Sequence, residues 1–211
     1  MNKILNIHCH PSENTVLKTN CIYCYLHPHY PIQTSHYSSF GVHPWYIPEE
    51  KIDWVKFRSI ASQPCVKMIG ECGLDTFSKV PLPTQINVFK AQVEISESLQ
   101  KPLLIHMVRT TTEIMAIHDQ LKPTQPWIIH GFRGKPQLAK QYLDHHILLS
   151  FGYQFNLKTI KSVPLNKLFL ETSDSQNTID QVIEKVAYHK KIAPQELIKQ
   201  IYSNTASLFF S

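Results

Sequence analysis

The sequence has no apolar run that approaches the ~18 residues needed to cross a membrane. Its first ten residues, MNKILNIHCH, lack the long apolar segment and the small-residue cleavage site of a secretory signal peptide. Glycine is scarce, at 6 of 211 residues, and the 14 prolines are spread along the chain, so no flexible linker is apparent. We therefore expect no membrane association and a single domain over residues 1–211.

Charged residues are also few, at 18% of the chain, with 21 lysines and arginines against 16 aspartates and glutamates. Together with 43% hydrophobic residues, this composition excludes a highly charged disordered chain and is sufficient for one sizeable core. The formal net charge of +5 falls short of the dense basic patch of a sequence-reading DNA-binding module. It is compatible with a phosphate-bearing substrate without requiring one.

The five cysteines are an odd number spread through the chain, which does not fit a disulfide framework. They favour reduced thiols and a cytoplasmic location. Cys21 and Cys24 form a C-x-x-C sequence, but no second pair at zinc-ribbon spacing accompanies them. We interpret both as small buried residues of one strand, with a redox or zinc role as the alternative.

Short apolar runs recur along the chain and end in polar or histidine-bearing segments. Eight such runs lie at 3–8, 21–26, 37–42, 65–70, 102–106, 126–131, 146–151 and 167–172. Uninterrupted apolar character predicts strands buried on both faces, as in a parallel sheet.

Segments with helical periodicity lie between several of these runs. One apolar stripe runs from Ile179 to Ala187, and the other consists of Val88, Ala91, Ile95 and Leu99. The alternation predicts the α/β class, and eight strands in one domain predict a (β/α)₈ TIM barrel. Because 211 residues are few for this fold, we expect a compact barrel with shortened connecting helices, between residues 27 and 36 and after the seventh strand.

Residues able to bind metal follow the predicted strands at their carboxyl ends. They are His8 and His10 after the first strand, His43 after the third, Glu71 after the fourth, His106 after the fifth and His130 after the sixth. Because the strands of a parallel barrel all end at one face, we expect these side chains to converge on one mouth.

The types and spacing of these residues indicate a metal site. His8 and His10 point to the same side of a strand because side chains at i and i+2 do so. Imidazole nitrogens and carboxylate oxygens suit Zn²⁺, Mn²⁺ and similar cations. A glutamate such as Glu71 can bridge two metals, an arrangement that activates a water molecule. A lone histidine is more often a satisfied polar residue. Four histidines and one glutamate at the ends of four different strands are harder to explain that way; they are His8, His10, Glu71, His106 and His130.

Eight motifs follow one another along essentially the whole chain. They are N-I-H-C-H, F-G-V-H-P, M-I-G-E-C-G-L-D, P-L-L-I-H, W-I-I-H-G-F-R-G, L-S-F-G, L-F-L-E-T-S-D-S and S-N-T-A-S-L-F. This ordered series resembles the TatD family of metal-dependent deoxyribonucleases, in the amidohydrolase-type barrel superfamily, and a compact branch of it in particular. The resemblance implies that DNA is the substrate and that one or two divalent cations, such as Zn²⁺, Mn²⁺ or Mg²⁺, are the cofactor. It implies metal ligands at His8, His10, Glu71, His106 and His130.

Two departures from the family's motifs concern acidic residues. The family often has an aspartate two residues before the first histidine, where this chain has Asn6. The family's E-T-D motif aligns with Glu171, Thr172 and Ser173, so a serine stands where the resemblance implies an aspartate that binds metal and activates water. A serine hydroxyl cannot serve as a base near neutral pH.

Asp174 follows this serine directly and is the substitute that we expect. On a regular strand, a shift of one residue turns the side chain to the opposite face, but a local bulge can re-aim it. Asp174 is therefore predicted as a metal ligand and catalytic base, with Glu71 as the other catalytic residue. The alternatives are a weakened one-metal site, or a protein that binds substrate without turnover.

The predicted site also has groups that could hold phosphate. His43, Arg109 and Arg133 lie near strand ends, and a guanidinium matches phosphate oxygens in bidentate geometry. The sequence thus predicts a metal-dependent hydrolase, a deoxyribonuclease that cleaves phosphodiester bonds. Because a fold does not fix a reaction, an amidohydrolase-type enzyme acting on a small substrate is the alternative. No obligate protein partner is expected.

Overall fold

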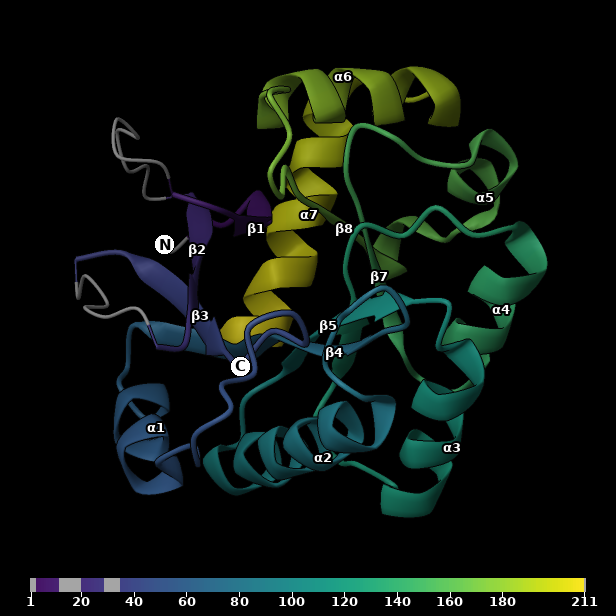
Figure 1. Ribbon diagram of the computed structural model, residues 1–211. Coiled ribbons are helices and arrows are strands. Elements are labelled where there is room, and N and C mark those ends of the chain that lie inside the picture. Colours follow the sequence, from purple (N-terminus) through teal and green to yellow (C-terminus); the bar gives the residue numbers. More distant parts are fainter. Residues whose placement is uncertain (1–2, 12–19, 29–34, 211) are drawn as a thin grey trace. The chain divides into compact units, whose positions relative to one another are not determined.

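The computed structural model describes residues 3–11, 20–28 and 35–210 (Figure 1). Its eight-stranded sheet follows the sequence order from β1 to β8. The strands are β1 (Asn6–Cys9), β2 (Cys21–Leu26), β3 (Tyr37–Gly41), β4 (Val66–Asp75), β5 (Leu103–Val108), β6 (Trp127–Ile129), β7 (Leu148–Phe151) and β8 (Leu168–Leu170). Each strand overlaps one of the eight predicted apolar runs, which confirms the number and order of the strands, but β4 continues to Asp75, beyond the predicted end at residue 70.

Helices separate most of the later strands. They are α1 (Trp54–Ala61), α2 (Leu82–Leu99), α3 (Thr111–Leu121), α4 (Pro136–Asp144), α5 (Leu157–Ser162), α6 (Ile179–Lys190) and α7 (Pro194–Phe209), with a short 3₁₀ helix at Leu165–Lys167. After β7 the connecting helix α5 has only six residues, as the chain length predicts. The other expected short connection includes residues 29–34, which lie outside the described residues.

The chain divides into two compact units. The first unit comprises Met1–Tyr23 and Ile128–Ser211, and the second comprises Cys24–Trp127. The single domain over residues 1–211 stays a prediction. Within the described parts of the chain, no helix is both long enough and apolar enough to span a bilayer.

In the second unit, β3 pairs in parallel with β4, and β4 pairs in parallel with β5. Helices α1 and α2 follow β3 and β4 along the chain (Figure 1). Aromatic rings fill the core of this unit, with Phe40 packed on Phe57 and Phe89 packed on Trp127. Cys24 is buried in its strand, as predicted, and burial raises the pKa of its thiol.

The apolar stripe predicted for α2 does not coincide with the face of the helix that is buried in the structure. Val88 and Ala91 are only half-buried, whereas Phe89 and Val93 are in the core. The prediction missed this face because part of it is polar: Gln85 and Gln92, among others, are buried there. The stripe predicted for α6 is confirmed, since its residues are buried throughout.

The two buried glutamines of α2 hold the ends of β3 and β4. The Oε1 of Gln92 accepts a hydrogen bond from the backbone N–H of Val42 at 2.7 Å, and its Nε2 donates to the Val42 carbonyl at 3.1 Å. Gln85 makes the same pair of bonds with the backbone of Asp75, at 2.8 and 3.1 Å. Helix α2 therefore fixes the backbone from which His43 and Asp75 project.

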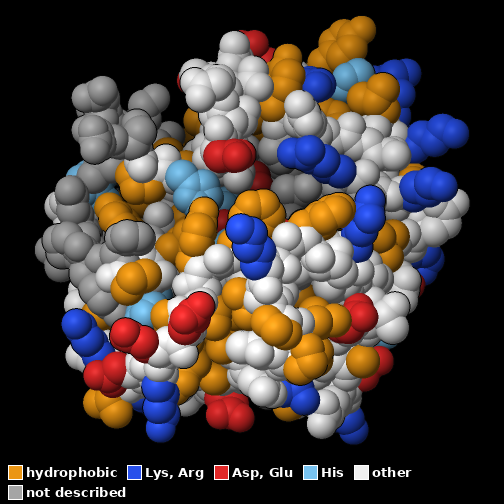
Figure 2. Space-filling view, viewed as in Figure 1, with side chains coloured by type: hydrophobic (Ala, Val, Ile, Leu, Met, Phe, Trp, Pro, Cys, Tyr) orange, Lys and Arg blue, Asp and Glu red, His pale blue; other side chains and the backbone are white. Residues whose placement is uncertain are grey.

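In the first unit, β1 pairs with the start of β2, and β7 pairs with β6 and β8. Helix α7 ties the two segments of this unit together. The Thr205 hydroxyl donates to the carbonyl of Ile4 at 2.9 Å, and the Asn204 amide donates to the carbonyls of Leu165 and Leu168 at 2.8 Å. On the face shown in Figure 2, lysine and arginine side chains lie over α5, where Lys158 and Lys161 are exposed.

Glu97 of α2 stabilises the connection between α3 and β6. Its carboxylate accepts hydrogen bonds from the backbone N–H groups of Thr124 and Gln125 and from the Thr124 hydroxyl, at 2.6–3.0 Å. Burial opposes ionisation, but these hydrogen bonds outweigh it and lower the pKa of Glu97 below its ordinary value. A carboxyl with a lowered folded pKa stabilises the fold above its unfolded pKa, and this contribution disappears as the pH falls through the folded pKa.

We expect Glu97→Gln to lower the free energy of unfolding by about 1 kcal/mol at pH 7. The difference from the natural chain should shrink below about pH 4, the range in which a free glutamate becomes protonated. Urea denaturation at pH 7, 5 and 3.5 measures it. The control is Glu94→Gln on the same helix, where the side chain is exposed. A Glu97→Gln effect of equal size at every pH would contradict the expected role of the charge.

Candidate metal-binding site

Two buried carboxylates lie on β4 of the second unit. Glu71 is 3% exposed and Asp75 is 1% exposed. Gly73 lies between them with a φ of 139°, in register with His106 of β5, and a Cβ at this position would collide with the His106 carbonyl. The glycine of the E-C-G-L-D motif therefore lets β4 approach β5 closely at the residue that carries the imidazole.

The imidazole of His106 lies between the two carboxylates. Its Nδ1 is 2.8 Å from Oε1 of Glu71, and its Nε2 is 2.8 Å from Oδ2 of Asp75. The Nε2 of His43, which follows β3, is 3.3 Å from the same Glu71 oxygen. Ligand atoms of His43, Glu71 and His106 all lie within 4.8 Å of one another. The second unit thus brings three of the predicted site residues together in a group able to hold a cation.

Asp75 is a member of this group that the sequence pattern did not predict. Besides His106, it accepts hydrogen bonds from the indole N–H of Trp45 at 2.7 Å and the backbone N–H of Phe77 at 2.8 Å. Burial opposes ionisation, but these hydrogen bonds outweigh it and hold the pKa of Asp75 below its ordinary value. Its position in the sequence could have indicated this role, because residues four apart on a strand, such as Glu71 and Asp75, point to the same side.

The ionised Asp75 decides how His106 is oriented. In a neutral His106 ring that ligates a cation through Nδ1, the hydrogen is on Nε2, which donates a hydrogen bond to the Asp75 carboxylate, a group that only accepts. Its Nδ1 is then the nitrogen that faces Glu71 and could ligate a cation. Metal-binding histidines commonly donate their other ring N–H to a carboxylate in this way.

His43 has the opposite arrangement of its ring nitrogens. The backbone N–H of Trp45 donates to its Nδ1 at 3.1 Å, so the Nε2 of a neutral His43 carries the proton. This nitrogen points at Glu71 as a donor and not as a lone pair. The geometry favours His43 as a hydrogen-bond donor to a carboxylate oxygen such as that of Glu71, and its substrate-binding role stays a prediction.

The first unit holds three further predicted ligands. The ring centroid of His8 lies 4.8 Å from that of His10 and 4.8 Å from that of His130. Oε1 of Glu171, a fully buried residue, lies 3.3 Å from Nδ1 of His130. Burial raises the pKa of Glu171, but the hydrogen bond and charge of His130, with the charge of His8, outweigh this effect and lower it. The sequence pattern assigned Glu171 no role, and the structure places it against a predicted ligand.

Ser173 lies beside the first histidine pair. Its N–H donates to the His8 carbonyl at 2.9 Å, and its carbonyl accepts from the N–H of His10 at 3.2 Å. Its φ of 53° is in the left-handed region, and β8 has already ended at Leu170. The regular alternation of a strand is therefore broken at this point, while Asp174 is exposed. The role predicted for Asp174 stays a prediction.

Asn6 braces the segment that carries Ser173. Its Nδ2 donates to the Thr172 hydroxyl at 2.8 Å, and its Oδ1 accepts from the Thr172 N–H at 3.1 Å. An aspartate at this position could accept but could not donate. Asn6 thus holds this segment through two hydrogen bonds to Thr172.

Both arginines predicted to hold phosphate are exposed. Arg109 follows β5, and its guanidinium lies over the ring of Phe77, 4.6 Å from the centroid. Arg133 follows β6 in the first unit. Their contacts with phosphate stay predictions.

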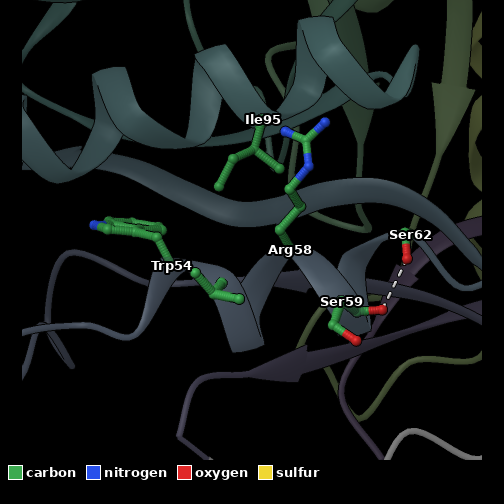
Figure 3. A pocket seen from close by; sticks show the side chains of 6 residues that line it. Trp54, Arg58, Ser59, Ser62 and Ile95 are labelled. Carbon is green, nitrogen blue, oxygen red and sulfur yellow. Dashed lines mark hydrogen bonds between the residues drawn. The ribbon is translucent and has the colours of Figure 1, made fainter.

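A surface pocket of the second unit lies between α1 and α2 and is separate from the histidine group (Figure 3). Its lining residues are Trp54, Val55, Arg58, Ser59, Ser62 and Ile95. None of them is a histidine, cysteine or carboxylate, so this pocket does not offer the ligands of a metal site.

The orientation of His106 by Asp75 can be tested by substitution. We expect Asp75→Asn to weaken binding of Zn²⁺ or Mn²⁺ by about 10-fold, because the amide no longer fixes the ring with a charged acceptor. Isothermal titration calorimetry measures the affinity, and the visible spectrum of the Co²⁺-loaded protein reports the altered ligand geometry. Asp144→Asn, an exposed change on α4, is the control. An unchanged affinity and spectrum would show that Asp75 does not position the ligand.

Comparisons with known proteins identify the family of this chain. A family model described as TatD related DNase matches residues 28–210. An uncharacterised metal-dependent hydrolase of Bacillus subtilis, YabD, is 25% identical over 198 residues, which cover 82% of this chain and 77% of that protein. The 3'-5' ssDNA/RNA exonuclease TatD of Citrobacter rodentium is 25% identical over 212 residues, covering 87% of this chain and 80% of that protein.

A solved structure confirms the fold class. The crystal structure of YJJV, a TatD homologue from Escherichia coli, superposes with a TM-score of 0.79 at 17% identity, covering 100% of this chain and 99% of that chain. This likeness confirms the predicted compact (β/α)₈ fold. Since the family model covers most of the chain, the predicted resemblance is confirmed as well: the chain belongs to the family of TatD-related DNases, among relatives named metal-dependent hydrolase and exonuclease.

Proposed function

We propose that this protein is a metal-dependent phosphodiester hydrolase that acts as a deoxyribonuclease. The observation that carries the proposal is the group on β3, β4 and β5, in which buried Glu71 lies against two imidazoles. Buried carboxylates are normally paired by cations or hydrogen bonds, and this one faces nitrogen atoms of the kind that bind transition metals. The names of the relatives, which include an exonuclease, support hydrolysis of nucleic acid as the reaction.

The proposed metal ligands are His8, His10, Glu71, His106 and His130, with Asp174 as a further ligand. Their donors are mainly imidazole nitrogens, which suit Zn²⁺ better than Mg²⁺, while Glu71 also accommodates Mn²⁺. When bound, one or two such cations would lower the pKa of a water molecule and offset the negative charge of the phosphodiester.

The protein's own groups supply binding and orientation. Asp75 holds the His106 ring through Nε2 and leaves Nδ1 directed at Glu71. The protonated Nε2 of His43 can donate to a phosphate oxygen, and the guanidinium groups of Arg109 and Arg133 can neutralise phosphate charge. Asp174 is the proposed base that accepts a proton from water. The cytoplasmic location expected from the cysteines is also a proposal.

Metal analysis joined to hydrolysis assays tests the function. The purified protein is analysed for bound metal, stripped with a chelator, and assayed on single- and double-stranded DNA with Zn²⁺, Mn²⁺ or Mg²⁺ added back. We expect cleavage that is lost on chelation and restored by Zn²⁺ or Mn²⁺. If no DNA is cleaved with any cation while an amide or lactone is hydrolysed, the amidohydrolase alternative replaces the nuclease.

Ser173 favours a second candidate function, a relative that binds nucleic acid without turnover. The position aligned with the family's aspartate carries a hydroxyl, which is a poor metal ligand and a poor base near neutral pH. Metal and DNA binding without cleavage in the same assays would support this candidate.

A further inference from the structure

The loops that follow β3 and β4 expose large aromatic side chains. Trp45 is 53% exposed, Tyr46 is 55% exposed and Phe77 is 60% exposed. Single exposed apolar residues are ordinary, but aromatic side chains gathered on adjoining loops mark an interaction surface. All three residues belong to the second unit, as do Glu71 and His106.

These loops are tied to each other although their rings are exposed. The indole N–H of Trp45 and the backbone N–H of Phe77 both donate to the carboxylate of Asp75, at 2.7 and 2.8 Å. The Ser78 hydroxyl donates to the Pro44 carbonyl at 2.8 Å, which joins the two loops a second time. Because the hydrogen bonds already fix Trp45 and the loop around Phe77, a ligand that stacks there has less conformational freedom to remove.

The positively charged side chain of Arg109 lies beside these aromatic residues. The guanidinium of Arg109 stacks over Phe77, 4.6 Å from the ring centroid, and the side chain is exposed. A planar guanidinium on an aromatic face still has N–H groups at its edge that can bind phosphate. Aromatic faces with arginine are the combination by which proteins hold unpaired bases and the adjoining backbone.

The exposed surface is continuous with the candidate metal-binding group. Oδ2 of Asp75 accepts a hydrogen bond from Trp45 and also contacts Nε2 of His106, whose other nitrogen faces Glu71. A base stacked on this surface would therefore place its own phosphate near the imidazoles.

We propose that Trp45, Phe77 and Arg109 form a stacking platform for an unpaired nucleobase of a single-stranded nucleic acid. The platform selects single strands because a paired base within a duplex is already stacked on both faces. This inference rests on the proposed function, and it names the residues by which the same site would hold a base of the single-stranded nucleic acid that appears in the names of its relatives.

Binding without divalent cations tests the platform separately from cleavage. The probe is a fluorescein-labelled oligothymidylate, measured by fluorescence anisotropy in the presence of EDTA. We expect Phe77→Ala to weaken its binding by about 10-fold, while Phe77→Tyr, which keeps an aromatic face, binds like the natural chain. The control is Tyr188→Ala on α6. This variant also removes an exposed aromatic side chain, 78% accessible, but from the first unit and not from the platform. Circular dichroism verifies that each variant is folded.

An oligonucleotide of abasic residues provides the complementary test. It retains the phosphates but has no bases, so the natural chain should bind it about 10-fold more weakly than oligothymidylate. In Phe77→Ala the difference between the two oligomers should be smaller. Quenching of tryptophan fluorescence by oligothymidylate should be lost in Trp45→Phe.

The outcomes separate the platform from the proposed function. Equal binding of thymidylate and abasic oligomers, or normal binding by Phe77→Ala, overturns the platform even if the natural chain cleaves DNA. A natural chain that cleaves nothing but prefers the base-bearing oligomer through Phe77 supports the platform and refutes the hydrolase.

Discussion

Replacing Glu71 by glutamine is expected to lower the rate of DNA hydrolysis on the order of 10³-fold, comparable with the loss of a key charge-stabilising group. The amide is nearly the same size as the carboxylate but has no negative charge. It therefore removes the anion that lies against the imidazoles of His43 and His106. Because Glu71 is buried, no solvent-exposed carboxylate can move into its position without displacing core side chains.

Metal content distinguishes the catalytic role of Glu71 from a structural one. Inductively coupled plasma mass spectrometry should show reduced bound metal in Glu71→Gln, and thermal denaturation should show a folded protein. The control is Glu94→Gln, which makes the same chemical change at an exposed position of α2 and should retain full metal content and activity. If Glu71→Gln cleaves DNA at the natural rate with full metal content, Glu71 is neither a ligand nor catalytic.

If the natural chain lacks a working base, restoring an aspartate at position 173 is expected to raise the rate of hydrolysis by about 100-fold, the lower range of what a general base contributes. Position 173 lies between the backbone groups of His8 and His10, so the new carboxylate would enter the region of the first histidine pair. The left-handed φ of 53° does not oppose the change, since aspartate adopts this conformation more readily than most residues.

Comparing Ser173→Asp with Asp174→Ala and with the double variant decides the role of Asp174. If Asp174 is the working base, Asp174→Ala should abolish cleavage in the natural chain, and Ser173→Asp should rescue it. If the natural chain lacks a base, Asp174→Ala changes little and Ser173→Asp creates activity. Ser59→Asp, on exposed α1, controls for the added charge. A natural chain that cleaves at ordinary rates and gains nothing from Ser173→Asp would refute the view that the serine limits turnover.

The strands were predictable because most of their residues are buried on both faces. The runs Leu103–Ile105 and Leu168–Leu170 are uninterrupted because successive side chains, which point to opposite faces, are all buried. The burial of α2 was harder to read, since Gln85 and Gln92 occupy its inner face to bond the backbone at the ends of β3 and β4. Periodicity counts apolar side chains and does not recognise a polar residue buried by its hydrogen bonds.

The candidate ligands were predictable from their types and their places after the strands. Asp75 and Glu171 were missed. The spacing of four residues from Glu71 was a signal for Asp75, but the contact with a histidine is what identifies each of the two carboxylates as its support. The sequence could state that Ser173 and Asp174 differ from the family's motif. It could not give the φ of Ser173, which depends on the pairing of this segment with the backbone of His8 and His10.

By itself, the sequence determined the α/β class, the eight strands, the family and the set of histidines and glutamate, because burial and chemistry select residue types locally. Only the tertiary structure decided which nitrogen of His106 faces Glu71, why Asn6 suits its position, and that Arg109 stacks on Phe77 beside an exposed Trp45. These properties arise from contacts between residues distant in the chain, and hydrogen-bond geometry within about 3 Å is not encoded in any local pattern.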